Sequence, residues 1–304
     1  MTKKVFISYC HKQGDWVLNR LLPCLRYGGA EVLIDKERFK AGKAVLGEMD
    51  ATQDKADIHV LVFSLEYLAS PYCQHEMNRA IDKDPSFQRG IVIPVLREAC
   101  TLPVQITQHN PIYVNLQDDK NSDQWHLLLQ ACKADLGCAA PEWLQARDEI
   151  VRYFNRKDSV NLIVSGNPKW KELISHIKED CFPDLGIVDL ESGATASRRG
   201  LVAEILKACC SPTRVPRENE DLVELNRVLN ERQISRLAIQ HFDLVAYRHK
   251  PYGIDLFAAL RNLIMISKKV DVLIQSRKPF LALLPKDNPL STIDLKTVEL
   301  RGSK

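Results

Sequence analysis

The stretch from residue 58 to residue 83 constrains the fold most strongly, because a buried strand is followed there by the start of a helix. Residues 58–64 read IHVLVFS, an apolar and β-branched run typical of a buried strand. Ser70 and Pro71 then signal a helix start, since serine accepts hydrogen bonds from free amides and proline has a preset φ. Strands that alternate with helices in this way build parallel α/β sheets.

Helical spacing places Glu76 beside the packed face of this helix. The inner face is predicted to comprise Cys73, Met77, Ala80 and Ile81. Glu76 falls on the adjacent stripe, one turn after Tyr72, and we expect it at the margin of the packed face. Ligands bind in open α/β sheets at this carboxyl edge. On spacing alone, however, a single glutamate on a helix is more often a solvated charge.

The rest of the first half repeats the alternation of strand and helix. The first helix is predicted from a helical stripe that runs from Leu18 to Leu25, with a kink expected at Pro23 and Asp15 as a candidate cap. The last helix of this half is expected over 124–136. Strands are predicted at residues 4–9, 32–35, 58–64, 91–96 and 111–116. Short links between them predict a doubly wound parallel sheet.

A chain of 304 residues is longer than a domain with one small hydrophobic core, and this length predicts two domains. We place the first at 1–137, a connection at 138–157 and a second α/β domain at 158–304. Within the second domain, strands are expected at 160–164, 186–190 and 270–275, with a further apolar run at 235–246.

Bulk composition excludes several classes of protein. A net charge of +3 gives no basis for nucleic-acid binding, and no apolar run approaches the roughly 20 residues of a membrane span. The first residues lead directly into a strand, so no signal peptide is expected. The nine cysteines lack regular spacing and are expected to be reduced in a cytoplasmic protein, and no metal site is predicted.

Four segments carry a family resemblance in their order and spacing. They are Val5–Tyr9, Asp15–Trp16, Glu31–Lys43 and Ile58–Glu76. Residues 1–137 resemble the TIR (Toll/interleukin-1 receptor) domain family, in particular its NAD-hydrolysing bacterial members. The resemblance implies a flavodoxin-like domain with a five-stranded parallel sheet. It also implies an NAD+ glycohydrolase, gated by assembly, that serves as a bacterial immune (anti-phage) or signalling effector.

The resemblance assigns roles to individual residues. Family enzymes carry a catalytic glutamate on the helix after the third strand, and Glu76 occupies that position. NAD+ is then the substrate, with no cofactor and no metal. Residues implied in substrate binding are Ser8, Tyr9, Cys10, His11, Phe39, Lys43, Ser64 and Tyr72. The loop over residues 36–44 is implied in self-association and gating, through Asp35, Phe39 and Gly42.

Several of these roles have ordinary structural alternatives. Tyr72 either stacks on nicotinamide or packs as a half-buried side chain, and His11 either contacts NAD+ or is a surface histidine. Ser8 and Ser64 either bind substrate or satisfy turns. For the whole domain, the alternative is a noncatalytic TIR adaptor or virulence mimic that acts through contacts between TIR domains. Glu76 beside an aromatic residue favours the enzyme, because a scaffold does not need that pair.

The second region faintly resembles the nucleotide-binding core of signal-transduction ATPases. Asp243 closes an apolar run as a magnesium-binding aspartate would, and Arg277 follows a strand like a sensor arginine. The first strand, however, leads into GNPKW at residues 166–170 instead of a phosphate-binding loop, and Pro168 lacks an amide donor. We therefore expect a nonhydrolysing module that senses an unknown trigger or drives oligomerisation.

Overall fold

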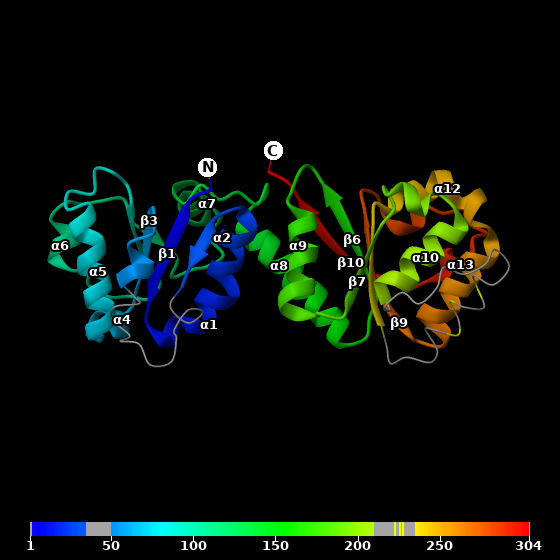
Figure 1. The fold of residues 1–304 in the computed structure, drawn as a ribbon, viewed down its shortest axis with the longest axis horizontal. Helices are drawn as coiled ribbons and strands as arrows, with labels where there is room; N and C mark the ends of the chain where they lie inside the picture. Colours follow the sequence, from blue (N-terminus) through cyan, green and yellow to red (C-terminus); the bar gives the residue numbers. More distant parts are fainter. Residues whose placement is uncertain are drawn as a thin grey trace. The chain divides into compact units, whose positions relative to one another are not determined.

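The computed structural model describes residues 2–34, 50–209 and 235–303, together with Leu222, Leu225 and Arg227. The chain divides into two compact units, Met1–Leu144 and Gln145–Lys304. Each contains its own five-stranded sheet, and every paired strand in both sheets is parallel (Figure 1). The division falls inside helix α8 (Ala140–Asn155).

The first sheet has the order β2-β1-β3-β4-β5, which confirms the expected flavodoxin-like fold. Its strands are β1 (Lys4–Tyr9), β2 (Glu31–Leu33), β3 (Ile58–Phe63), β4 (Val92–Leu96) and β5 (Val114–Asn115). The strand predicted at 111–116 is therefore reduced to two residues. β1 lies between β2 and β3, so the strand order reverses at β1 and β3, where ligands bind in folds of this type.

Two layers of helices enclose this sheet (Figure 1). One layer contains a segment that runs through α1 (Gly14–Trp16), the π-helical η2 (Val17–Leu21) and α2 (Leu22–Gly28), and also α7 (Ser122–Ala131). The other contains α4 (Leu65–Ala69), α5 (Pro71–Lys83) and α6 (Val104–Thr107). The 3-10 turn η1 (His11–Gln13) follows β1.

The observed helix boundaries confirm some of the predicted helix starts and ends and contradict others. Pro23 stands in the first turn of α2, directly after the π-helical segment, as expected of a residue without an amide donor. Gly29 ends α2 with φ 106°, a conformation that favours glycine. Asp15 was expected to cap the first helix, and this was wrong: Gln13 precedes α1 with no side-chain cap. The last helix begins and ends earlier than predicted, although Trp125, Leu128 and Leu129 are buried.

The second sheet has the order β10-β6-β9-β8-β7. Its strands are β6 (Val160–Ser165), β7 (Leu185–Asp189), β8 (Ser235–Gln240), β9 (Val270–Ser276) and β10 (Lys296–Arg301). The first four match the predicted apolar runs. β10 was not predicted, because it is an edge strand in which buried Val298 and Leu300 alternate with exposed polar residues.

Helices and short turns pack against this second sheet. The helices are α9 (Trp170–His176), the π-helical η4 (Ile177–Cys181), α10 (Arg198–Cys209), α12 (Val245–Tyr252), α13 (Ile254–Arg261) and the π-helical η7 (Asn262–Ile266). The 3-10 turns are η5 (Gly193–Ala196), η6 (Phe242–Leu244), η8 (Phe280–Ala282) and η9 (Pro289–Thr292). One apolar cluster joins α10, α12 and α13 to strands β7, β8 and β9.

Two further observations apply to the described residues of both units. The cysteines among the described residues are all free thiols. Within the same residues, no helix combines the length and the apolar character that crossing a membrane would require.

Candidate functional site

The switch point of the first sheet brings three polar side chains together from separate elements. Ser8 lies near the carboxyl end of β1, Tyr67 lies on α4 and Glu76 lies in the second turn of α5. Ser8 Oγ donates to Glu76 Oε2 at 2.5 Å and lies 2.9 Å from the Tyr67 hydroxyl oxygen. These contacts join positions that are 59 and 68 residues apart in the chain.

Glu76 is buried, with 3% of its surface exposed, and this corrects the prediction that it lies at the margin of the packed face. The helical periodicity of apolar residues shows only which side of one helix is packed, so it does not reveal a polar partner on another element. Burying a carboxylate is costly unless hydrogen bonds replace its water. Ser8 supplies such a bond, and it is itself 1% exposed.

The hydrogen bonds in this cluster have a defined direction when the carboxylate is ionised. An ionised carboxylate only accepts, and the single Ser8 proton points to Glu76, so Tyr67 donates to Ser8. Burial raises the pKa of Tyr67 well above its ordinary value of 10.0, and the nearby Glu76 charge raises it further. Tyr67 therefore stays protonated and available as a donor.

Tyr67 was not predicted as a site residue, because the short helix α4 was not predicted between the strand and the helix that starts at Pro71. The available signal was Ser64, whose Oγ accepts a hydrogen bond from the Tyr67 amide at 3.1 Å and caps α4. This bond places Tyr67 on the first turn of the short helix, where its ring packs 5.0 Å from that of Phe63. The Ser64 side chain is fully buried, and its oxygen serves the helix start.

The helix that carries Glu76 is fixed to residues 50–54 by polar contacts. Gln53 Nε2 donates to the Glu76 carbonyl oxygen at 2.7 Å. Three residues spaced four apart on α5 also contact this segment through ion pairs and hydrogen bonds. These contacts join His75 to Asp50 at 2.9 Å, Arg79 to Asp54 at 2.8 Å and Lys83 to Asp54 at 3.1 Å. These contacts hold the helix in the rotation that turns Glu76 inward.

The other residues predicted for the site surround this cluster unevenly. Tyr9 and Cys10 are half-buried at the end of β1, and His11 is exposed at the start of η1. Tyr72 is 57% exposed, so its side chain is more open than the half-buried alternative. Asp35, Phe39, Gly42 and Lys43 lie outside the described residues, as does the whole loop 36–44.

The two residues likened to an ATPase site have structural partners in the second unit. The Asp243 carboxylate accepts the backbone N–H of Arg277 at 2.9 and 3.1 Å and so joins the turns after β8 and β9. Gly166 follows β6 with φ 74°, and a Cβ there would lie 3.1 Å from the backbone of Gly302. Among the described residues, side chains with metal-ligating atoms gather at Asp189, Glu191 and His241 in this unit.

Comparisons with known proteins relate part of the first unit to a known family and to two known proteins. Residues 5–129 match a family model described as TIR domain. Toll-like receptor 1 of Homo sapiens is 29% identical over 72 residues, 24% of this chain and 9% of the receptor. The uncharacterized protein y4lF of Sinorhizobium fredii is 34% identical over 100 residues, 32% of this chain and 30% of that protein. The chain thus matches less than a third of either relative.

Solved structures give two further similarities. One is the TIR domain of the Toll-related receptor TRR-2 of Hydra magnipapillata, with 18% identity and a TM-score of 0.38, covering 43% of this chain and 99% of that one. The other is the Walker-type ATPase paby2304 of Pyrococcus abyssi, with 14% identity and a TM-score of 0.37, covering 51% of this chain and 53% of that one.

Proposed function

Residues 5–129 form a TIR domain, and from this premise we propose that the chain is an NAD+ glycohydrolase with Glu76 as its catalytic carboxylate. The observation that carries the proposal is the position of this carboxylate. It lies at the switch point of the sheet, in the second turn of α5, and the Ser8 hydroxyl holds one of its oxygens. Ligands of doubly wound sheets bind at such a position.

The proposed reaction explains why one carboxylate is sufficient. The bond between ribose C1′ and the nicotinamide nitrogen breaks, and its electron pair leaves with nicotinamide, which becomes a neutral pyridine. No proton donor is needed for this leaving group, in contrast to ordinary glycosidases. Positive charge develops on the ribose, and an ionised Glu76 stabilises it. Water then adds to C1′ and releases a proton to solvent, giving ADP-ribose.

Ser8 and Tyr67 act in this proposal as positioning residues. The hydrogen bonds from Tyr67 to Ser8 and from Ser8 to Glu76 fix the carboxylate before substrate arrives. A carboxylate held in a buried site interacts more strongly with a developing positive charge than one in water, because the local dielectric constant is lower.

Burial also places a condition on activity. With 3% of its surface exposed, Glu76 reaches a ribose only after its surroundings rearrange. We propose that association between TIR domains of separate copies drives this change, and that loop 36–44 takes part. The second unit, Gln145–Lys304, would then receive the trigger for an immune or signalling response.

Nicotinamide release from NAD+ across a range of protein concentrations tests the proposal. We expect release per chain to rise steeply with protein concentration, because assembled copies carry the activity. Chemical crosslinking at low concentration should raise the rate to the same plateau. The absence of release from both concentrated and crosslinked protein would contradict the enzymatic function.

A noncatalytic adaptor is the second candidate, and one observation favours it. The side chain and carbonyl of Glu76 are both engaged, by Ser8 and Gln53, as they would be if the residue only stabilised the fold. An adaptor would self-associate over the same concentration range without releasing nicotinamide. The same chromatographic assay, combined with light scattering, therefore separates the two functions.

A further inference from the structure

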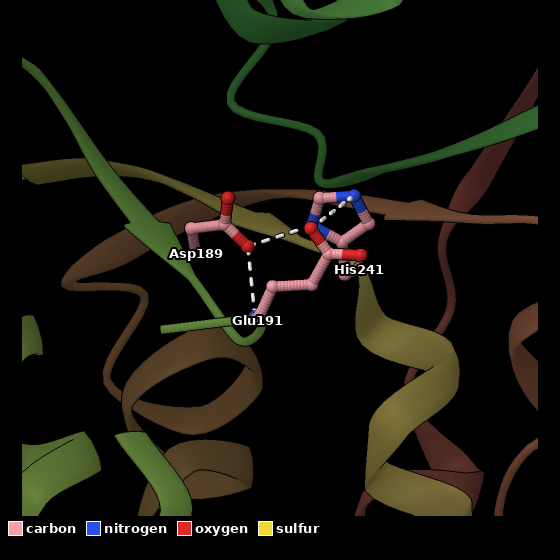
Figure 2. Close-up of side chains that lie close together, drawn as sticks. All are labelled: Asp189, Glu191 and His241. Carbon is pink, nitrogen blue, oxygen red and sulfur yellow. Dashed lines mark hydrogen bonds and ion pairs between the residues drawn. The ribbon is translucent and has the colours of Figure 1, made fainter. Parts of the chain in front are cut away.

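Three potential metal ligands converge at the carboxyl ends of two neighbouring strands in the second unit (Figure 2). Asp189 is the last residue of β7, Glu191 lies two residues later, and His241 directly follows β8. β7 and β8 pair in register, with Asp189 opposite Gln240, so the segments that follow them lie side by side. The sheet therefore joins residues that are 52 positions apart.

The distances between their polar atoms are short. His241 Nδ1 lies 2.6 Å from Asp189 Oδ1, and His241 Nε2 lies 3.5 Å from Glu191 Oε2. One ligand atom from each residue lies within 4.8 Å of the other two. Ligands bound at about 2.0–2.2 Å from one zinc ion are separated by roughly 3–4.4 Å. One ion binds only one ring nitrogen, and the 2.6 Å between His241 Nδ1 and Asp189 Oδ1 is shorter than this range, so metal binding requires that hydrogen bond to open. Glu191, whose side chain is 60% exposed, has room to move toward the ion.

Neighbouring groups orient the cluster from several sides. The Glu191 backbone N–H donates to Asp189 Oδ1 at 2.9 Å, and the Gln275 side-chain oxygen accepts the backbone N–H of His241 at 2.8 Å. The Trp170 ring meets the imidazole edge-on at 5.0 Å. The imidazole is thus placed by its backbone and by an aromatic contact as well as by the carboxylates, which is the support that a metal ligand needs.

Two carboxylates lie beside one imidazole in this cluster. A bound cation would offset their negative charge and accept a lone pair from the imidazole. We propose that Asp189, Glu191 and His241 bind one divalent transition-metal ion in this position. Imidazole combined with carboxylate oxygens suits zinc and its neighbours better than magnesium or calcium, which prefer oxygen alone.

Lys171 is the competing positive charge. Its Nζ lies 3.4 Å from Asp189 Oδ2, and its side chain is half exposed. Replacing it with glutamine removes that competition and leaves the three ligands in place. Lys171→Gln is therefore expected to strengthen metal binding by roughly three- to tenfold, an effect that a simple network of ion pairs would not produce.

Titration of the metal-free full chain with Zn2+ near pH 7.5, followed by elemental analysis, tests the site. The wild type should bind one Zn2+ per chain. Glu191→Gln should weaken binding about tenfold, and His241→Asn about a hundredfold or more. Asparagine suits this variant because His241 has φ 55°, a conformation that asparagine tolerates. His126→Asn, at an exposed position on α7, is the matched control and should bind as the wild type does.

A second readout remains valid if the His241 variant fails to fold. Ni2+ bound at the cluster should quench Trp170 fluorescence, because the indole lies against His241. Quenching should be lost in Glu191→Gln at Ni2+ concentrations that saturate the wild type. Absence of stoichiometric binding up to about 1 mM metal, or equal affinity in the wild type and Glu191→Gln, would overturn the proposal and leave the three residues as ion pairs only.

Discussion

Removing the Ser8 hydroxyl should destabilise the first unit more than removing the hydroxyl of Tyr67. Ser8→Ala takes away a hydrogen bond to a carboxylate, worth about 1.5–3 kcal/mol, and also leaves the fully buried Tyr67 hydroxyl without its acceptor. We expect a loss of about 2–4 kcal/mol in the free energy of unfolding. Tyr67→Phe removes only the outer bond of the pair and should cost about 0.5–1.5 kcal/mol.

The double variant gives the sharper test. Once Ser8 is alanine, the Tyr67 hydroxyl is an unsatisfied buried group, so adding Tyr67→Phe should be neutral or stabilising. Urea unfolding followed by tryptophan fluorescence in a Trp170→Phe background reports on the first unit, because Trp16, Trp125 and Trp143 all lie there. Additive losses from the two substitutions would refute the proposed chain of hydrogen bonds.

Two further predictions concern buried positions away from this cluster. Burial, and secondarily the charge of Lys83, lower the pKa of His59 from its ordinary 6.5 to about 4. The folded state therefore excludes a proton that the unfolded chain binds, so stability on the order of 3 kcal/mol is complete above pH 6.5 and is lost progressively as pH falls from 6.5 to 4. Urea unfolding at pH 7 and pH 5 should show this loss in the wild type but not in His59→Leu; an unchanged loss in the variant would exclude His59 as its source. In the second unit, Gly200→Ala would bring Cβ into the Ala194 carbonyl oxygen and should cost about 1–3 kcal/mol or more, whereas Gly193→Ala meets nothing within 4 Å and should be near neutral. Equal melting temperatures for these two variants would contradict the close approach at Gly200.

The architecture could be predicted because buried parallel strands have a strong local signature. The strand predicted at residues 4–9 matches β1 in both bounds, and the apolar run before Ser64 is β3. Strands that are short or amphipathic lack this signature, and their predictions were incomplete or absent. β5 retains only Val114 and Asn115, and β10 reads as a mixed polar segment because it lies at the edge of its sheet.

The candidate site could be predicted only in part, because its geometry depends on contacts between distant residues. Glu76 was singled out by its position on a helix after a strand, yet its burial depends on Ser8, 68 residues earlier. Tyr67 required the recognition of a five-residue helix, too short to show periodicity. The cluster of Asp189 with His241 was likewise missed, because the pairing of β7 with β8 creates it.

A comparison of two isosteric variants tests the proposed function most directly. Nicotinamide release should be measured for the wild type, for Glu76→Gln and for Glu66→Gln, at a concentration where light scattering shows equal assembly. Glu66 lies on α4 and pairs with Lys12 at 2.8 Å, so its variant controls for the loss of a nearby carboxylate. We predict a loss of about a hundredfold or more for Glu76→Gln and wild-type turnover for Glu66→Gln. Wild-type turnover by Glu76→Gln would contradict the assignment of Glu76 as the catalytic carboxylate.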